Sequence, residues 1–161
     1  MTIHELKLDT EIFPGVQSKL KNFEIRKNDR NFQVGDTLIL KAFKKGKYVV
    51  GYTGYSSHPE TQSLEIIGWK NCKKAEAEII KVKVMSKFDA DGVNEAFDGA
   101  IQIEKENDDG RSIPTIFMSV GISPRHEING QDVVRVLQNY FNTDRMPEDY
   151  VLLGIEVLEN D

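Results

Sequence analysis

The chain has 161 residues, one cysteine and a formal net charge of -5 at neutral pH. This length predicts a single domain with its own hydrophobic core, and the lone cysteine excludes an internal disulfide. The excess of carboxylates argues against a protein that coats nucleic acid without specificity, because that mode of binding depends on Lys and Arg.

The sequence pattern also predicts where the protein is found. No apolar stretch reaches the length of a membrane span, and no apolar run follows a basic N-terminus as in a secretory signal. The three histidines are isolated and the single cysteine gives no zinc spacing, and no phosphate-binding loop is recognisable. We therefore expect a cytoplasmic protein with no membrane partner, no metal site and no cofactor.

The first half of the chain predicts short strands joined by tight turns. Apolar and polar side chains alternate, as in half-buried strands, over 3–8, 23–27, 37–43 and 48–55. Ile12, Phe13, Val16 and Leu20 recur at helical spacing, which predicts a short helix ending near Leu20. The segment Lys44–Lys47 is typical of a hairpin tip, and residues 56–75 are expected to be mainly loop.

The second half predicts one long acidic segment between regular elements. A strand is expected at 78–85, a helix over 131–142 from its apolar stripe, and a core strand at 150–158. Residues 88–110 hold eight acidic side chains and one lysine and end in "DDG", a turn signal that predicts a hairpin there. We expect an α+β fold with six or seven strands, two helices near opposite ends, and a mostly antiparallel or barrel-like sheet.

A strong charge asymmetry draws attention to one stretch, "LKNFEIRKNDRNFQVGD" (20–36). From Lys19 to Lys47 the chain has nine basic residues and three acidic ones, so a small electropositive site on an acidic protein is expected. Glu24 and Arg26 share one face of the strand at 23–27, and Lys21 precedes that strand. Lys27, Asp29 and Arg30 continue the motif.

This motif has two interpretations. If its polar face lines a cavity, Arg26 supplies fixed donors and Glu24 supplies acceptors, which together match the edge of a nucleobase. A lysine beside an arginine can also act as a base or nucleophile. The alternative is an exposed strand face with ordinary ion pairs, which composition alone favours.

Other side chains give weaker signals. His4 shares a strand face with two leucines, so a histidine in the core or at a cavity rim is favoured over a proton shuttle. Tyr48, Tyr52 and Tyr55 follow the basic stretch and can stack on bases, although tyrosines in a hairpin are more often packing residues.

The first 43 residues, with "HELKL", "FEIRKNDR" and "VGD", resemble the ASCH-like domains of the PUA-like superfamily, in particular a phage and mobile-element branch of unknown function. The resemblance implies a small PUA-like (ASCH-type), mostly antiparallel β barrel with flanking helices. It implies one domain over 1–161, with residues 88–145, including the acidic hairpin, as an insertion. The family motif falls on Lys21, Glu24 and Arg26, beside a cleft proposed to bind RNA or a nucleotide. The motif's glycine and threonine are Lys19 and Asn22 here.

Three functions follow from this reading. The first is an RNA-binding or nucleotide-binding module with His4, Lys21, Glu24, Arg26, Lys27, Asp29 and Arg30 at the ligand. The second is a small amidohydrolase acting on an acylated nucleoside such as N4-acetylcytidine, because a bacterial ASCH relative is similar to such an enzyme; Lys21 and Glu24 would then be catalytic. The third is a phage accessory protein that binds a protein partner through the acidic segment 88–110.

Overall fold

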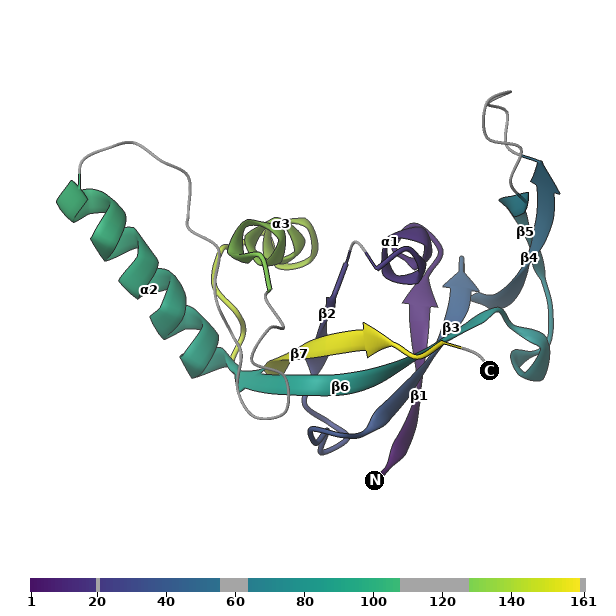
Figure 1. Ribbon diagram of the computed structural model, residues 1–161, viewed down its shortest axis with the longest axis horizontal. Coiled ribbons are helices and arrows are strands. Elements are labelled where there is room, and N and C mark those ends of the chain that lie inside the picture. The colour runs from purple at the N-terminus through teal and green to yellow at the C-terminus, as the bar shows by residue number, and fades with distance from the viewer. Residues whose placement is uncertain (20, 56–63, 108–127, 160–161) are drawn as a thin grey trace. The chain divides into compact units, whose positions relative to one another are not determined.

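A computed structural model describes residues 1–19, 21–55, 64–107 and 128–159. Within these ranges the chain forms seven strands, three α-helices and one 3-10 turn (Figure 1). In order they are β1 (Ile3–Asp9), α1 (Phe13–Gln17), β2 (Phe23–Lys27), β3 (Thr37–Lys44), β4 (Lys47–Tyr55), β5 (Leu64–Asn71), η1 (Lys74–Glu76), β6 (Ile79–Asp89), α2 (Ala90–Asn107), α3 (Gly130–Phe141) and β7 (Tyr150–Val157).

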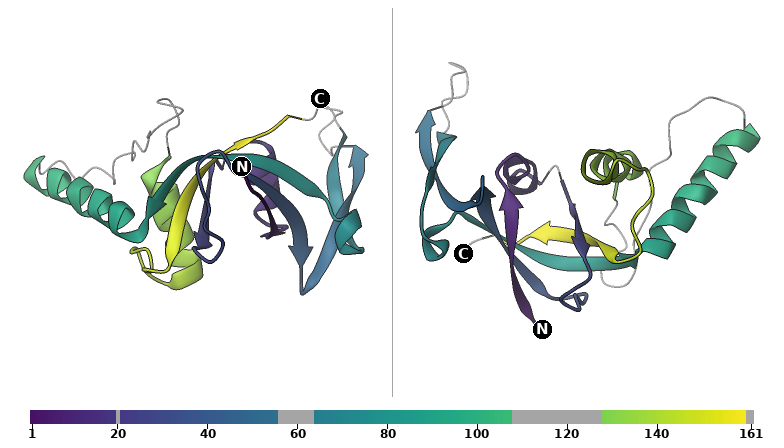
Figure 2. Two further views of the ribbon diagram at one scale, coloured as in Figure 1. Left: turned by 90° about the horizontal axis from the view of Figure 1, so that it is seen from below. Right: turned by 180° about the vertical axis from the view of Figure 1, so that it is seen from behind.

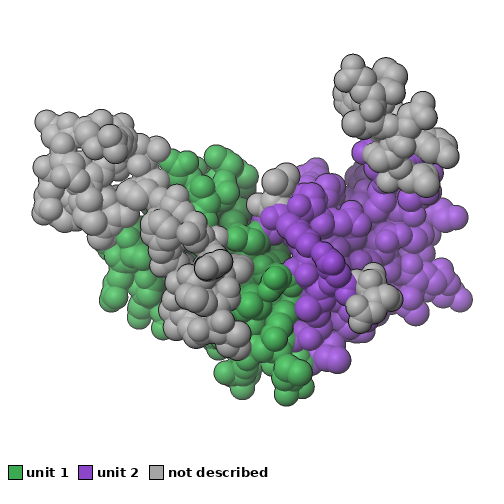
Figure 3. Space-filling model, viewed as in Figure 1, with its two compact units in different colours: residues 1–2, 22–36, 83–156 green, residues 3–21, 37–82, 157–161 purple. Residues whose placement is uncertain are grey.

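These elements divide into two compact units, shown in separate colours in Figure 3. Unit 1 comprises residues 1–2, 22–36 and 83–156, and unit 2 comprises residues 3–21, 37–82 and 157–161. Charge is distributed unequally between them: unit 2 has eleven lysines against nine carboxylates, a net of +2, and unit 1 has ten cations against seventeen carboxylates, a net of -7. The acidic character of the protein therefore belongs to unit 1.

Unit 2 is a sheet with one helix packed on it. β3 pairs with β1 in parallel and with β4 antiparallel, and β4 pairs antiparallel with β5. The alternation predicted for β1 is confirmed, because His4, Leu6 and Leu8 are buried while their neighbours are exposed. α1, which follows β1 along the chain (Figure 2), packs through Phe13. The Phe13 ring meets Trp69 edge to face at 5.2 Å between centroids.

Unit 1 packs α2 and α3 against strands in the order β2-β7-β6. Its core joins residues of β2 and β7 to helical residues that are distant in sequence, namely Phe23, Ala90, Val93, Phe97, Ile128, Val133, Leu137, Met146 and Leu152. Both helices begin at side-chain caps. The Asp89 carboxylate accepts from the N–H of Gly92, and the Asn129 side chain accepts from the N–H of Gln131.

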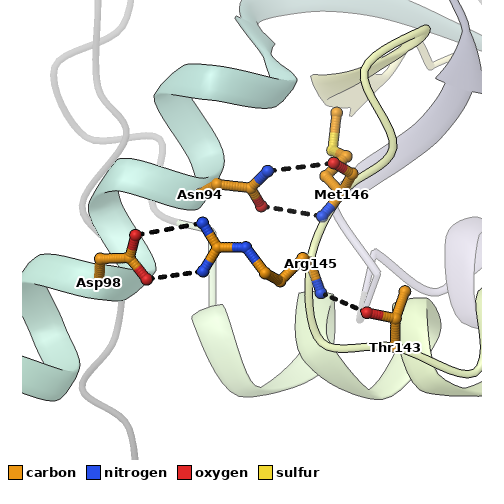
Figure 4. Close-up of polar contacts among 5 residues, drawn as sticks. All are labelled: Asn94, Asp98, Thr143, Arg145 and Met146. Atoms are coloured by element: carbon orange, nitrogen blue, oxygen red, sulfur yellow. Dashed lines mark hydrogen bonds and ion pairs between the residues drawn. The ribbon is translucent and has the colours of Figure 1, made fainter.

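Four side-chain contacts join α2 to the loop that follows α3 (Figure 4). The Asn94 amide donates to the carbonyl of Met146 at 3.0 Å and accepts from its N–H at 2.8 Å. The Arg145 guanidinium donates to both oxygens of Asp98, at 2.7 and 3.1 Å. Arg145 lowers the pKa of the Asp98 carboxyl, chiefly through this hydrogen bond. The loop is therefore held at two successive turns of α2.

Several expectations are corrected by this fold. The α+β class and the mostly antiparallel sheet are confirmed, but the sheet is not closed into a barrel: its order runs from β2 at one end to β5 at the other. The expected hairpin in the acidic segment is wrong where the chain is described, since residues 90–107 form α2. Part of the expected loop at 56–75 is strand β5, and the described residues form three α-helices where two were expected. The part of the expected hairpin after residue 107 lies outside the described residues.

The physical reason for α2 is its core contact. Ala90, Val93 and Phe97 are spaced three and four residues apart, so they form one apolar stripe, which is buried in the core of unit 1. The eight carboxylates of residues 88–110 made this helical spacing of apolar residues hard to recognise in the sequence. None of the helices in the described part of the chain combines the length and apolar character that a membrane crossing requires.

Candidate functional site

The predicted recognition motif lies on β2 in unit 1, where Glu24 and Arg26 form a close ion pair. The Nε–H of Arg26 donates to Oε2 of Glu24 at 3.0 Å. The Glu24 side chain is 4% exposed and that of Arg26 is 23% exposed. The motif is therefore not an exposed strand face: its carboxylate is buried, and its guanidinium reaches partly to the surface.

The surroundings of Glu24 on the sheet are apolar. In the antiparallel register of β2 and β7, Glu24 lies opposite Leu153 and Arg26 lies opposite Val151, and both partners are buried. Residues directly opposite each other in an antiparallel pair project from the same face. A carboxylate in such surroundings is poorly hydrated, so its bond to Arg26 is electrostatically stronger than an exposed pair.

The turn that follows β2 presents the rest of the motif to solvent. Lys27, Asp29 and Arg30 are all exposed. The Lys27 ammonium lies 4.0 Å from the Asp149 carboxylate, with both side chains 61% exposed, and the N–H of Asn28 donates to the carbonyl of Asp149 at 2.7 Å. The turn thus begins from a fixed position beside β7.

The loop that returns from this turn is anchored by residues outside the predicted motif. The buried carboxylate of Asp36 accepts from the backbone N–H groups of Thr2 and Gln33, both at 3.0 Å. Gly35 has a φ of 95°, which an L side chain rarely adopts. Lys87 donates from Nζ to the carbonyl of Phe32 at 2.7 Å. The "VGD" pattern predicted a turn at Gly35 and Asp36, whereas nothing in the sequence indicated a role for Lys87.

The remaining predicted site residues, His4 and Lys21, belong to unit 2. His4 is 8% exposed on β1, on the same strand face as two leucines, as the alternation predicted. Lys21 is half-buried, and its backbone N–H donates to the carbonyl of Gly15 at 3.0 Å. The structure brings Glu24 and Arg26 together within unit 1, and the roles of His4 and Lys21 stay predictions.

The side chains of the β2 motif offer hydrogen-bond donors and acceptors. The described residues contain no group of three His, Cys, Asp or Glu side chains arranged to hold a metal ion. A planar guanidinium fixed by a buried carboxylate is preorganised for hydrogen bonds in one plane. The exposed cations Lys27 and Arg30 follow at the end of the same strand.

The comparisons with known proteins find relatives of unknown function. Residues 3–62 match a family described as "Domain of unknown function (DUF3850)". The "Uncharacterized 12.9 kDa protein in GpA 3'region" of Escherichia phage P2 is 46% identical over 46 residues, which are 29% of this chain and 42% of that protein. The chain therefore matches less than half of that relative's length.

One solved structure is also similar to this chain. The structure "Crystal structure of hypothetical protein PH0355" is 18% identical, with a TM-score of 0.40, and the match covers 97% of this chain and 99% of that one. Likeness to an uncharacterised phage protein agrees with the phage resemblance of the sequence. The ASCH and PUA-like assignment stays a prediction.

Proposed function

We propose that this chain is a binding module of ASCH or PUA-like type that recognises RNA or a nucleotide-like ligand through β2 and the turn after it. The observation that carries the proposal is the pair of Glu24 and Arg26, in which a buried carboxylate holds a partly exposed guanidinium at 3.0 Å. Burying a charge costs free energy, and the attraction to a buried partner does little more than offset that cost. The pair of Glu24 and Arg26 therefore contributes little to the stability of β2.

The pair fits the edge of a planar polar ligand. Arginine presents N–H donors in a rigid plane, and a nucleobase presents carbonyl and ring-nitrogen acceptors in one plane. Arg26 reads the base, and Glu24 fixes the rotamer of Arg26. Lys27 and Arg30, exposed at the end of the strand, contact phosphate, and Asp29 shapes the turn between them.

The position of the motif supports this proposal. Residues 3–62, which match the domain of unknown function, include β2 and its turn. They also include the whole of the basic stretch from Lys19 to Lys47, which has nine basic residues and three acidic ones.

An amide NMR titration tests the proposal. Labelled protein is titrated with a short mixed single-stranded RNA, with cytidine and with N4-acetylcytidine. We expect shifts that cluster on residues 22–36. Arg26→Lys keeps the charge but loses the planar fork, so it should raise Kd about 10-fold or more, as loss of one bidentate base contact does. Arg135→Lys, the same substitution at an exposed position of α3, is the matched control and should change Kd little.

Equal, small effects of the two variants would refute recognition by β2. Release of acetate from N4-acetylcytidine in the same tubes would replace the binding module with the amidohydrolase. If none of the three ligands causes amide shifts, the pair of Glu24 and Arg26 has only a structural role.

A further inference from the structure

Unit 2 carries a second feature that the β2 motif does not use, on the strand face opposite α1. Trp69 of β5 contacts Phe13 of α1, and Trp69 lies opposite Gly51 of β4. Because successive side chains of a strand point to opposite faces, Tyr52 and Tyr48 project from the face of β4 that is turned away from α1. Tyr52 is 50% exposed there.

Three aromatic rings follow one another on this face. Phe43 and Tyr48 are directly opposite each other on β3 and β4, and their rings meet edge to face at 5.1 Å between centroids. Tyr52 lies four residues further along β4, about 13 Å away at the usual rise of a strand. Its ring covers Gly68 of β5, where a Cβ atom would overlap the tyrosine ring. Glycine at this position therefore lets the ring lie flat against the sheet.

Lysines are interleaved with these rings. The Lys7 ammonium lies 4.6 Å from the centroid of the Phe43 ring. Lys70 is exposed on β5 and lies opposite Val50, between the two tyrosines along β4. We name as the aromatic face the residues Lys7, Lys41, Phe43, Tyr48, Tyr52 and Lys70. The turn between β3 and β4 adds three exposed lysines at its edge, Lys44, Lys45 and Lys47.

Carboxylates on and around this face offset only part of the charge. Glu5 lies 3.5 Å from Lys41 and 3.4 Å from Lys74, and Lys41 first and Lys74 second lower the pKa of Glu5. Asp9 lies opposite Phe43. Glu76 and Glu78 lie near Cys72, whose thiol pKa is raised chiefly by burial. Lys70 and the turn lysines Lys44, Lys45 and Lys47 therefore leave the face positive.

We infer that the aromatic face binds single-stranded nucleic acid, with bases stacked on Tyr48 and Tyr52 and phosphates at Lys7 and Lys70. Rings interleaved with cations suit this polymer, because every base has a face that stacks and every linkage carries a negative charge. An apolar protein partner would find charged lysines between the rings. Of the two units, unit 2 is the one with a positive net charge.

Fluorescence anisotropy with labelled 12-nucleotide oligo(dT) and oligo(rU) tests the inference over a series of NaCl concentrations. Tyr52→Leu should raise Kd about 5- to 150-fold, the range that loss of one stacked base gives, while Tyr52→Phe keeps the ring and should bind like the unmodified protein. Lys7→Gln should reduce the slope of log K against log salt by about 0.7. Tyr140→Leu and Arg135→Gln, on exposed positions of α3, are the matched controls and should change neither quantity.

Failure of both oligonucleotides to bind would overturn the inference, and so would equal effects of Tyr52→Leu and Tyr140→Leu. Dependence of oligonucleotide binding on Arg26 in place of Tyr52 would overturn it in favour of β2. The inference stands apart from the proposed function. Nucleoside binding without oligonucleotide binding refutes only the aromatic face. Oligonucleotide binding that is lost in Tyr52→Leu refutes only β2 if Arg26→Lys changes neither oligonucleotide nor nucleoside binding.

Discussion

The buried pair on β2 predicts an asymmetry between a single and a double substitution. In Arg26→Leu the buried Glu24 carboxylate beside Leu153 loses the donor at 3.0 Å. Removing one partner of a buried ion pair costs about 3–5 kcal/mol. Arg26 is 23% exposed, which lets water reach the site, so we expect the lower end, about 3 kcal/mol.

Replacing both residues removes the buried charge together with its partner. Glu24→Leu with Arg26→Leu places two apolar side chains beside Val151 and Leu153, and exchange of a whole buried pair for apolar residues is often neutral. We therefore expect the double variant to unfold within about 1 kcal/mol of the unmodified protein.

Urea denaturation followed by circular dichroism at 222 nm measures both variants. This signal reports on α2 and α3, which lie in unit 1 with the pair, whereas the single tryptophan, Trp69, lies in unit 2. Tryptophan fluorescence recorded in parallel shows whether the two units unfold together. A double variant as unstable as Arg26→Leu would refute the reasoning, because the cost would then come from lost packing and not from a buried carboxylate that has lost its arginine.

Further predictions concern α2. Phe97→Ala should lower the free energy of unfolding by about 3–5 kcal/mol in urea denaturation, because Phe97 is buried in the core of unit 1. The exposed neighbour Glu95 provides the control, and an effect of Phe97→Ala as small as that of Glu95→Gln would contradict this prediction. Asn94→Ala removes two hydrogen bonds to the loop after α3 (Figure 4) and should cost about 1–3 kcal/mol. Because Arg145 lowers the pKa of Asp98 from its ordinary 3.8, their contact should stabilise the fold above about pH 4 and fade as the pH falls through the lowered pKa. Asp98→Asn should remove that dependence, and equal acid sensitivity of both proteins would exclude it.

The core contacts of α2 also determine how the acidic segment 88–110 can be tested as a surface that binds a protein partner. Deleting residues 88–110 would remove Ala90, Val93 and Phe97 from the core of unit 1, so loss of partner binding would follow from unfolding alone. Charge-neutralising substitutions at exposed positions such as Asp91 and Glu95 keep the core and isolate the role of the carboxylates.

The sequence by itself determined most of the local structure. Alternation in "IHELKL" placed His4, Leu6 and Leu8 on one buried face, and the stripe of Val133 and Leu137 placed α3 within one residue at each end. Both patterns are set by neighbours along the chain, since a side chain's direction depends only on the backbone period. The resemblance of the first 43 residues likewise rested on contiguous sequence.

Only the tertiary structure decided which faces are covered and by what. Alternation showed that Glu24 and Arg26 share a face of β2, but the burial of Glu24 depends on surroundings that include Leu153, more than a hundred residues away. β5 contains glycine where a strand pattern would have an apolar residue, and Tyr52, its partner on β4, fills the space above Gly68. Burial and strand pairing are properties of surfaces that remote residues build together, so a local period cannot specify them.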